Sequence, residues 1–332
     1  MAISIDDIKK LRAMTGAGLA DVKKALTEAE GDFDKAKELL RERGLAIAAK
    51  RSDRETSNGC VLVKAVDGFA AMIALKCETD FVANGADFIA LTQSILDAAI
   101  AAKVKTLDEV KELTLANGQK VQDAVTQRSG ITGEKMELDG YLVLEGENVE
   151  VYDHMGKHML ATMVQLNKPA AEVGHKLAMQ VAAMKPVALD AQSIDQKILD
   201  EEYRTAVEKT KLEQVQKYVD MKIKKAGINP NLVDSEDHIE SNMSKGWLTQ
   251  EQADEARKII AEAKPEGEAQ LKMPMIEGIA KGRVEKFKKE SCLIDQEFQF
   301  GDGDKQTVSQ WLAQQDKELK IVDFKRFTLV AE

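Results

Sequence analysis

Two β-type runs joined by only two residues constrain this chain most. Cys60 to Val66 and Phe69 to Lys76 are separated by Asp67-Gly68 alone. Such a connection needs positive φ at both central positions, which Asp and Gly tolerate, so it predicts a tight antiparallel hairpin. The second run is almost wholly apolar and is expected to be a buried strand.

A similar strand–strand–helix pattern occurs a second time. Tyr141 to Glu145 and Val149 to Tyr152 are strand-like, and Leu160 to Leu166 resembles Ala70 to Leu75. A helical stripe follows each copy. A last strand-like run, Leu319 to Val330, is expected to join the second sheet. We predict an α+β fold with a duplicated core of small antiparallel sheets, its halves spanning 55–140 and 141–192, the second completed by 291–332.

The two copies differ between strand and helix. The first carries roughly five extra residues there, within Glu78 to Asn84. On a packing interpretation, Thr79 or Asp80 caps a helix and Phe81 packs beneath it. On a functional one, an acid and an aromatic ring inserted on one of two duplicate scaffolds form a binding loop. The asymmetry between the copies favours the second.

Residues 1–54 are predicted to form a three-helix docking module and a polar linker. Ser4 and Asp7 form a capping pair, and residues 15–18 interrupt the first helix. Gly31 and Asp32 separate the second helix from the third, and Gly44 is expected to close the third.

Residues 193–290 are predicted to be an inserted helical hairpin. Ser193 to Gln196 resembles a capping box, Thr249 to Gln252 is expected to begin another helix, and Pro265 interrupts the helical pattern. The hairpin either supports itself or serves as an arm for self-association or a partner; an apolar stripe fits both. Cys292 to Phe300 is expected to be a strand.

Composition narrows the classes of function. A length of 332 residues predicts two or more domains, and a net charge of −10 argues against a nucleic-acid or anionic-membrane binder. The sequence has no signal-peptide pattern and no apolar run long enough to span a bilayer, which predicts a cytoplasmic protein. Three unevenly spaced cysteines predict reduced thiols.

Motifs for catalysis are missing from the sequence. It contains neither a phosphate-binding Gly-x-x-x-x-Gly-Lys-Ser/Thr run nor a Gly-x-Ser-x-Gly elbow. His154 and His158 are four residues apart, but no carboxylate stands in zinc-site register with them. We expect no metal, no cofactor and no enzymatic activity.

Two stretches resemble the signatures of one family. Leu11 to Leu26 (LRAMTGAGLADVKKAL) is similar to the first signature of bacterial translation elongation factor Ts, and Leu75 to Asn84 (LKCETDFVAN) to the second. The resemblance extends over nearly the whole chain. It implies a guanine-nucleotide exchange factor for elongation factor Tu in protein biosynthesis, with a ubiquitin-associated-like docking module. Such a protein binds the GDP-bound and the nucleotide-free partner, and no nucleic acid directly.

The resemblance also implies the contact residues. A loop of Thr79, Asp80, Phe81 and Val82 would disturb the partner's magnesium and phosphate site and release GDP. The implied contacts of the docking module and, with weaker matches, of the two core halves are Leu11, Arg12, Thr15, Gly16, Gly18, Lys23, Gly133 and His154.

The chain departs from the family pattern in two places. It ends at Glu332, where some relatives continue into a further helix, and its 193–290 region is longer than expected. The main alternative is a ubiquitin-associated-type adaptor or chaperone, in which residues 1–54 bind alone and the Asp80 loop is dispensable. An enzyme with a site between the core halves is a third possibility.

Overall fold

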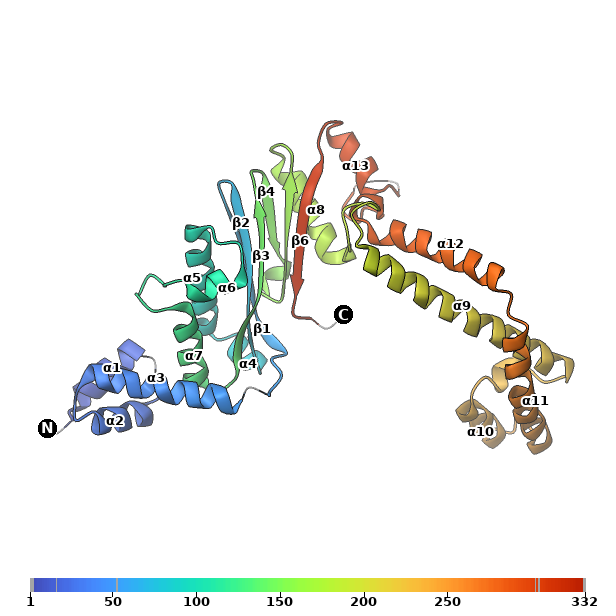
Figure 1. Cartoon of the computed structure of the whole chain (residues 1–332), viewed down its shortest axis with the longest axis horizontal. Helices are drawn as coiled ribbons and strands as arrows, with labels where there is room; N and C mark the ends of the chain where they lie inside the picture. Colours follow the sequence, from blue (N-terminus) through green and yellow to red (C-terminus); the bar gives the residue numbers. More distant parts are fainter. Residues whose placement is uncertain (1–2, 16, 52, 302, 304, 331–332) are drawn as a thin grey trace. The chain divides into compact units, whose positions relative to one another are not determined.

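The computed structural model describes residues 3–15, 17–51, 53–301, 303 and 305–330 (Figure 1). The chain divides into two compact units, residues 1–189 with 297–332, and residues 190–296. Among the described residues, no helix combines the length and the apolar character needed to cross a membrane. The helices of the first unit are α1 (Ile5–Thr15), α2 (Leu19–Glu28), α3 (Phe33–Lys50), α4 (Asp80–Ala83), α5 (Ala86–Ala102), α6 (Leu107–Glu112), α7 (Val121–Thr132), α8 (Ala171–Met184) and α13 (Val308–Gln315), with the 3-10 turn η1 (His154–Gly156).

Two antiparallel sheets of three strands form the core of the first unit, which confirms the predicted α+β class. One has the order β1-β2-β3 and the other β4-β5-β6. Their strands are β1 (Asn58–Val66), β2 (Phe69–Cys77), β3 (Met136–Glu145), β4 (Val149–Asp153), β5 (Leu160–Leu166) and β6 (Ile321–Thr328). Val66 pairs with Phe69 across the predicted hairpin turn. The returning C-terminal strand also lies where expected, beside β5.

The second copy of the repeat does not begin at Tyr141. The run from Tyr141 to Glu145 is the end of β3, which pairs with β2 in the first sheet. The predicted boundary between residues 140 and 141 therefore falls inside a strand. Gly140 interrupts the apolar pattern there because the sheets approach closely: a Cβ on Gly140 would lie 2.5 Å from the ring of Phe327.

Both faces of β2 are buried, as the apolar run predicts. Ala70, Met72 and Ala74 face the second sheet and pack with residues such as Met163. The alternate residues pack with Phe88 and its neighbours on α5. α5 thus covers one face of the first sheet (Figure 1).

Helices α1 to α3 form the N-terminal module around a core that includes Leu11, Val22 and Leu26. The prediction that Gly44 ends the third helix is wrong, since α3 continues to Lys50. Gly44 instead marks the crossing with α7, where a Cβ on Gly130 would lie 2.7 Å from the Gly44 Cα. Two glycines let the helix backbones meet.

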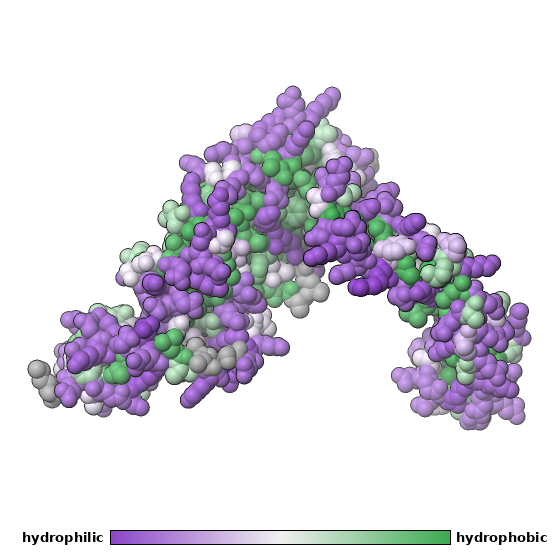
Figure 2. All heavy atoms as spheres, viewed as in Figure 1, coloured by the Kyte–Doolittle hydropathy of each residue, from purple (hydrophilic) through white to green (hydrophobic). Residues whose placement is uncertain are grey.

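The second unit has its own hydrophobic core and is helical. Its elements are α9 (Gln196–Lys225), η2 (Pro230–Leu232), α10 (Glu236–Ser244), α11 (Gln250–Ala269), α12 (Met273–Ser291) and η3 (Leu293–Asp295). Its core includes Val219, Ile223 and Ile239. The visible surface of this unit is mainly hydrophilic, with hydrophobic side chains scattered across it (Figure 2).

Several local predictions for this region need correction. A helix does begin after Thr249, with a capping box there, but Asp195 rather than Ser193 caps α9, because the Ser193 hydroxyl bonds Asp190. Pro265 lies inside α11 and does not end it. The expected strand over 292–300 is replaced by η3 and one isolated bridge, from Glu297 to Thr307.

Candidate partner-binding site

The loop inserted after β2 presents an exposed aromatic ring. Thr79 caps the short helix α4 by accepting a hydrogen bond from the Val82 N–H at 3.3 Å. The capping part of the packing interpretation is therefore confirmed. Its other part is wrong, because Phe81 is 87% exposed. Burial cannot explain a phenylalanine at this position.

The backbone of the loop is held from several sides. Asn84 Nδ2 donates to the Asp80 carbonyl at 2.8 Å, and the Cys77 thiol donates to the Thr79 carbonyl at 3.2 Å. Asn58 Nδ2 donates to the Glu78 carbonyl at 2.9 Å. The base of the loop is fixed, while the side chains of Asp80 and Phe81 are exposed.

The turn after α7 lies against this loop. Gly133 ends α7 with φ 70, a left-handed conformation that favours glycine. The next residue, Glu134, accepts bonds from the Thr79 N–H at 3.1 Å and the Thr79 hydroxyl at 2.6 Å. The structure thus brings Gly133 together with the Thr79–Val82 loop, although the two are more than fifty residues apart in the chain.

Glu78, at the start of the loop, is the centre of a charged network. Its carboxylate accepts the Lys135 N–H at 2.6 Å and pairs with Arg54 at 2.7 Å and Arg51 at 3.1 Å. The Lys135 bond, followed by those from the two arginines, lowers the pKa of Glu78 from 4.5 to about 2. The side chain is only 14% exposed, so it supports the loop from beneath instead of forming part of its exposed surface.

The predicted docking residues divide into buried and exposed groups. Leu11 is 0% exposed and lies in the module core, and Thr15 is buried, with its hydroxyl bonded to the Leu11 carbonyl at 2.7 Å. Arg12, Gly18 and Lys23 are exposed. Gly16 lies outside the described residues.

The prediction omitted two exposed apolar side chains of the same stretch. Met14 is 55% exposed and Leu19 is 59% exposed, on either side of the break between α1 and α2. A signal was present in the sequence, since both residues lie off the stripe that contains Leu11 and Val22. An apolar residue off the buried face of an amphipathic helix is a candidate contact.

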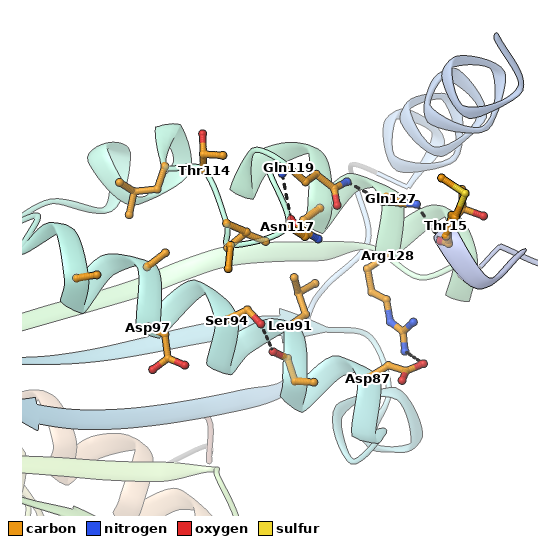
Figure 3. Close-up of a pocket in the computed structure, with 18 of the residues that line it drawn as sticks. Thr15, Asp87, Leu91, Ser94, Asp97, Thr114, Asn117, Gln119, Gln127 and Arg128 are labelled. Carbon is orange, nitrogen blue, oxygen red and sulfur yellow. Dashed lines mark hydrogen bonds and ion pairs between the residues drawn. The ribbon is translucent and has the colours of Figure 1, made fainter. Parts of the chain in front are cut away.

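A groove of about 990 Å³ lies where the module meets the core (Figure 3). The end of α1, one side of α5, α7 and the 113–119 connection line it. Gln127 donates to the Thr15 carbonyl at 2.8 Å and accepts from Gln119 at 2.7 Å, and Arg128 pairs with Asp87 at 2.9 Å. The Gln127–Thr15 bond joins the module to the core, and the other two contacts hold the core side of the groove.

His154 lies in the second half of the core, in η1 after β4. Its Nδ1 is 3.2 Å from the Tyr152 hydroxyl, and the next residue, Met155, is exposed with φ 58. His158 instead pairs with Asp153, so the two histidines do not share a site. Over the described part of the chain, no group of three His, Cys, Asp or Glu residues could hold a metal ion.

Comparison with known proteins gives consistent similarities. The family model described as "Elongation factor TS" matches residues 78–331. A protein of Parabacteroides distasonis named "Elongation factor Ts" is 57% identical over 332 residues, covering all of both chains. Proteins with the same name from Bacteroides fragilis and Porphyromonas gingivalis are 58% and 39% identical, again over the full length of both chains.

Proposed function

This chain belongs to the elongation factor Ts family, and on that premise we propose that it is a guanine-nucleotide exchange factor for elongation factor Tu. It binds the GDP-bound partner, releases GDP and is displaced when nucleotide binds again. One observation carries the proposal: Phe81 is 87% exposed on a turn whose backbone is already fixed. A rigid exposed aromatic side chain is typical of the residues that dominate protein–protein binding.

The chemistry of the loop fits displacement of a bound nucleotide. Magnesium and diphosphate are held by charge and near-ideal geometry, so a small shift of their surroundings weakens them greatly. Phe81 supplies an apolar wedge, Asp80 a carboxylate that competes for the same electrostatic environment, and Thr79 and Val82 the turn that carries them. No bond is made or broken, so the chain needs no nucleophile, general base or cofactor of its own. Because coupling between two ligands is reciprocal, nucleotide must in turn weaken this complex.

The N-terminal module supplies docking. Met14, Leu19, Arg12 and Lys23 offer apolar and basic side chains on its surface, while Leu11 and Thr15 support them from within. Hydrophilic residues cover most of the visible face of this module, with a few hydrophobic residues among them (Figure 2). Gly18, the N-cap residue of α2, belongs to the same surface, and Gly133 and His154 provide weaker contacts from the two core halves.

Other partners follow from charge and exposure. A net charge of −10 argues against direct binding of nucleic acid. A role in translation elongation implies a cytoplasmic protein. The hairpin unit is the candidate surface for self-association, because Leu212 on α9 and Met273 on α12 are exposed. Analytical ultracentrifugation at several protein concentrations tests self-association. A mass equal to that of a single chain at every concentration contradicts it.

Stopped-flow release of a fluorescent GDP analogue from elongation factor Tu tests the exchange function. We expect strong acceleration by the wild type and a loss of at least about 30-fold in Phe81→Ala, as for an aromatic hot spot. Asp80→Ala should lose less. Val322→Ala, which truncates an exposed apolar side chain on β6, is the control and should leave release unchanged.

Three outcomes separate the candidates. No acceleration by the wild type contradicts the exchange function and leaves the adaptor alternative, tested by binding of residues 1–54 alone. Acceleration that survives both loop substitutions contradicts the loop mechanism. If the wild type accelerates release and Phe81→Ala does not, although the variant unfolds at the same temperature, the result supports both the exchange function and the loop mechanism.

A further inference from the structure

Two carboxylates beneath the exposed loop have no role in the exchange proposal as stated. We infer that Glu134 and Glu78 are positioning residues: they hold the 78–84 turn in its binding geometry before the partner arrives and tie it to the docking module. The inference rests on the proposed exchange function, and it explains how Phe81 is held in the position that this function needs. Neither carboxylate is offered as a contact with the partner.

Glu134 fixes the turn at the N-cap of α4, Thr79. Both of its carboxylate oxygens are used, one by the Thr79 N–H and one by the Thr79 hydroxyl. The same hydroxyl oxygen accepts the Val82 N–H, so Glu134 also sets the direction of the cap. α4 has only four residues, far fewer than an isolated helix needs for stability. Its conformation therefore depends on such external bonds.

Glu78 joins the turn to two other segments. Arg51 directly follows the last helix of the docking module, and Arg54 lies in the linker; both pair with this carboxylate. Lys135, which donates its N–H to Glu78, also donates through its side-chain Nζ to the Arg54 carbonyl at 3.0 Å. The docking module, the turn and the segment between α7 and β3 thus meet at one partly buried carboxylate.

Phe81 can act as a wedge only if the turn that carries it has a fixed conformation. If the turn were loose, partner binding would have to order it, and Phe81 would enter its site in many orientations. Misplacement of a functional group by about 1 Å can cost about 100-fold in rate. The two carboxylates are therefore expected to affect the maximum rate of GDP release more than the concentration at half saturation, which the docking module governs.

Titration of GDP release with Glu134→Gln and Glu78→Gln tests the inference. We expect the maximum rate constant to fall about tenfold or more in Glu134→Gln, because the amide nitrogen cannot accept from Thr79. Asp139→Asn is the control: it removes a carboxylate charge on β3 whose bond goes to Lys76, outside the network of Glu78 and Glu134, and its rate should stay within about twofold. Combining Glu134→Gln with Phe81→Ala should cost no more than Phe81→Ala alone. Additive losses, or an unchanged rate in Glu134→Gln, would overturn the inference.

Hydrogen exchange of the free protein separates this inference from the exchange function. The amides of Val82, Ala83 and Asn84 are bonded within the turn. We expect them to exchange at least about tenfold faster in Glu134→Gln and Glu78→Gln, with helix α5 unchanged. Unchanged protection in both variants would refute the positioning role, whether or not the wild type releases GDP. Faster exchange beside a wild type inactive toward GDP would retain the positioning role and remove the exchange function.

Discussion

At the scale of single residues, Glu78 links the stability of the first unit to pH. Its pKa is about 2 in the folded protein, against 4.5 ordinarily, because the Lys135 N–H and two arginines favour the charged form. The unfolded chain takes up a proton near pH 4.5, whereas the folded chain does so only near 2. The stabilisation is therefore fully present above pH 4.5 and is lost as pH falls from 4.5 towards 2.

Glu78→Gln should expose this dependence. At neutral pH we expect the free energy of unfolding to fall by about 2 kcal/mol, since hydrogen bonds to a charged group are lost. The difference from wild type should shrink steadily below pH 4.5. Urea unfolding at several pH values measures it. A difference that is the same at neutral and acidic pH would mean that the carboxylate charge is not what stabilises the fold.

Gly140 is the second position where one residue decides packing. Gly140→Ala places a Cβ 2.5 Å from the Phe327 ring and 2.8 Å from the Ala74 Cβ, so the two sheets must separate. We expect a loss of about 1–3 kcal/mol in the free energy of unfolding. The same substitution at Gly278, in open space on α12, should instead stabilise by up to about 1 kcal/mol. Denaturant unfolding of both variants tests the contrast.

The position of the inserted loop was easier to predict from the sequence than the exposed positions of the docking module. The insertion between strand and helix singled out Thr79 to Val82 because two copies could be compared. Whether Phe81 pointed outward depended on contacts with Glu134, which lies far along the chain, so no local pattern could decide it. In the first signature, core and surface positions alternate at helical spacing. Leu11 was part of the apolar stripe, which already indicated burial.

At the scale of elements, the crossing of α3 and α7 fixes the docking module on the core. Gly130→Ala would place a Cβ 2.7 Å from the Gly44 Cα, where only backbone can move. We expect a loss of about 1–3 kcal/mol and faster hydrogen exchange in α3. Gly282→Ala, which meets open space on another helix, is the control. Unchanged exchange in α3 would show that the crossing does not hold the module.

Elements were predicted well where the signal was local and poorly where it was not. The capping pair of Ser4 and Asp7, the helix start at Thr249 and the turn at Gly68 depend on neighbouring residues, and all three are present. Gly44 resembled a helix end because its role lies in a helix that comes later in the chain. The first half of β3 was missed because turn residues precede it and Gly140 weakens its pattern. Strand pairing then assigned it to the first sheet.

At the scale of the whole molecule, the chain consists of two units with separate cores, and the candidate site lies in one of them. Replacing residues 190–296 by a short flexible linker should leave the sheets folded and the stopped-flow release of GDP accelerated. Circular dichroism provides the folding control. A folded variant with no acceleration would show that the hairpin unit contributes a contact of its own, and would contradict the assignment of the function to the first unit.

The exposure of Phe81 separates folding from function at this position. Because the ring contacts almost nothing in the free protein, selection for a folded, abundant chain cannot detect it. A mutational screen scored by cellular abundance would therefore rank Phe81 among the most tolerant positions, beside ordinary surface residues. The same library scored by growth that depends on exchange would rank it among the least tolerant. The disagreement between the two maps would outline the binding surface residue by residue, without a structure of the complex.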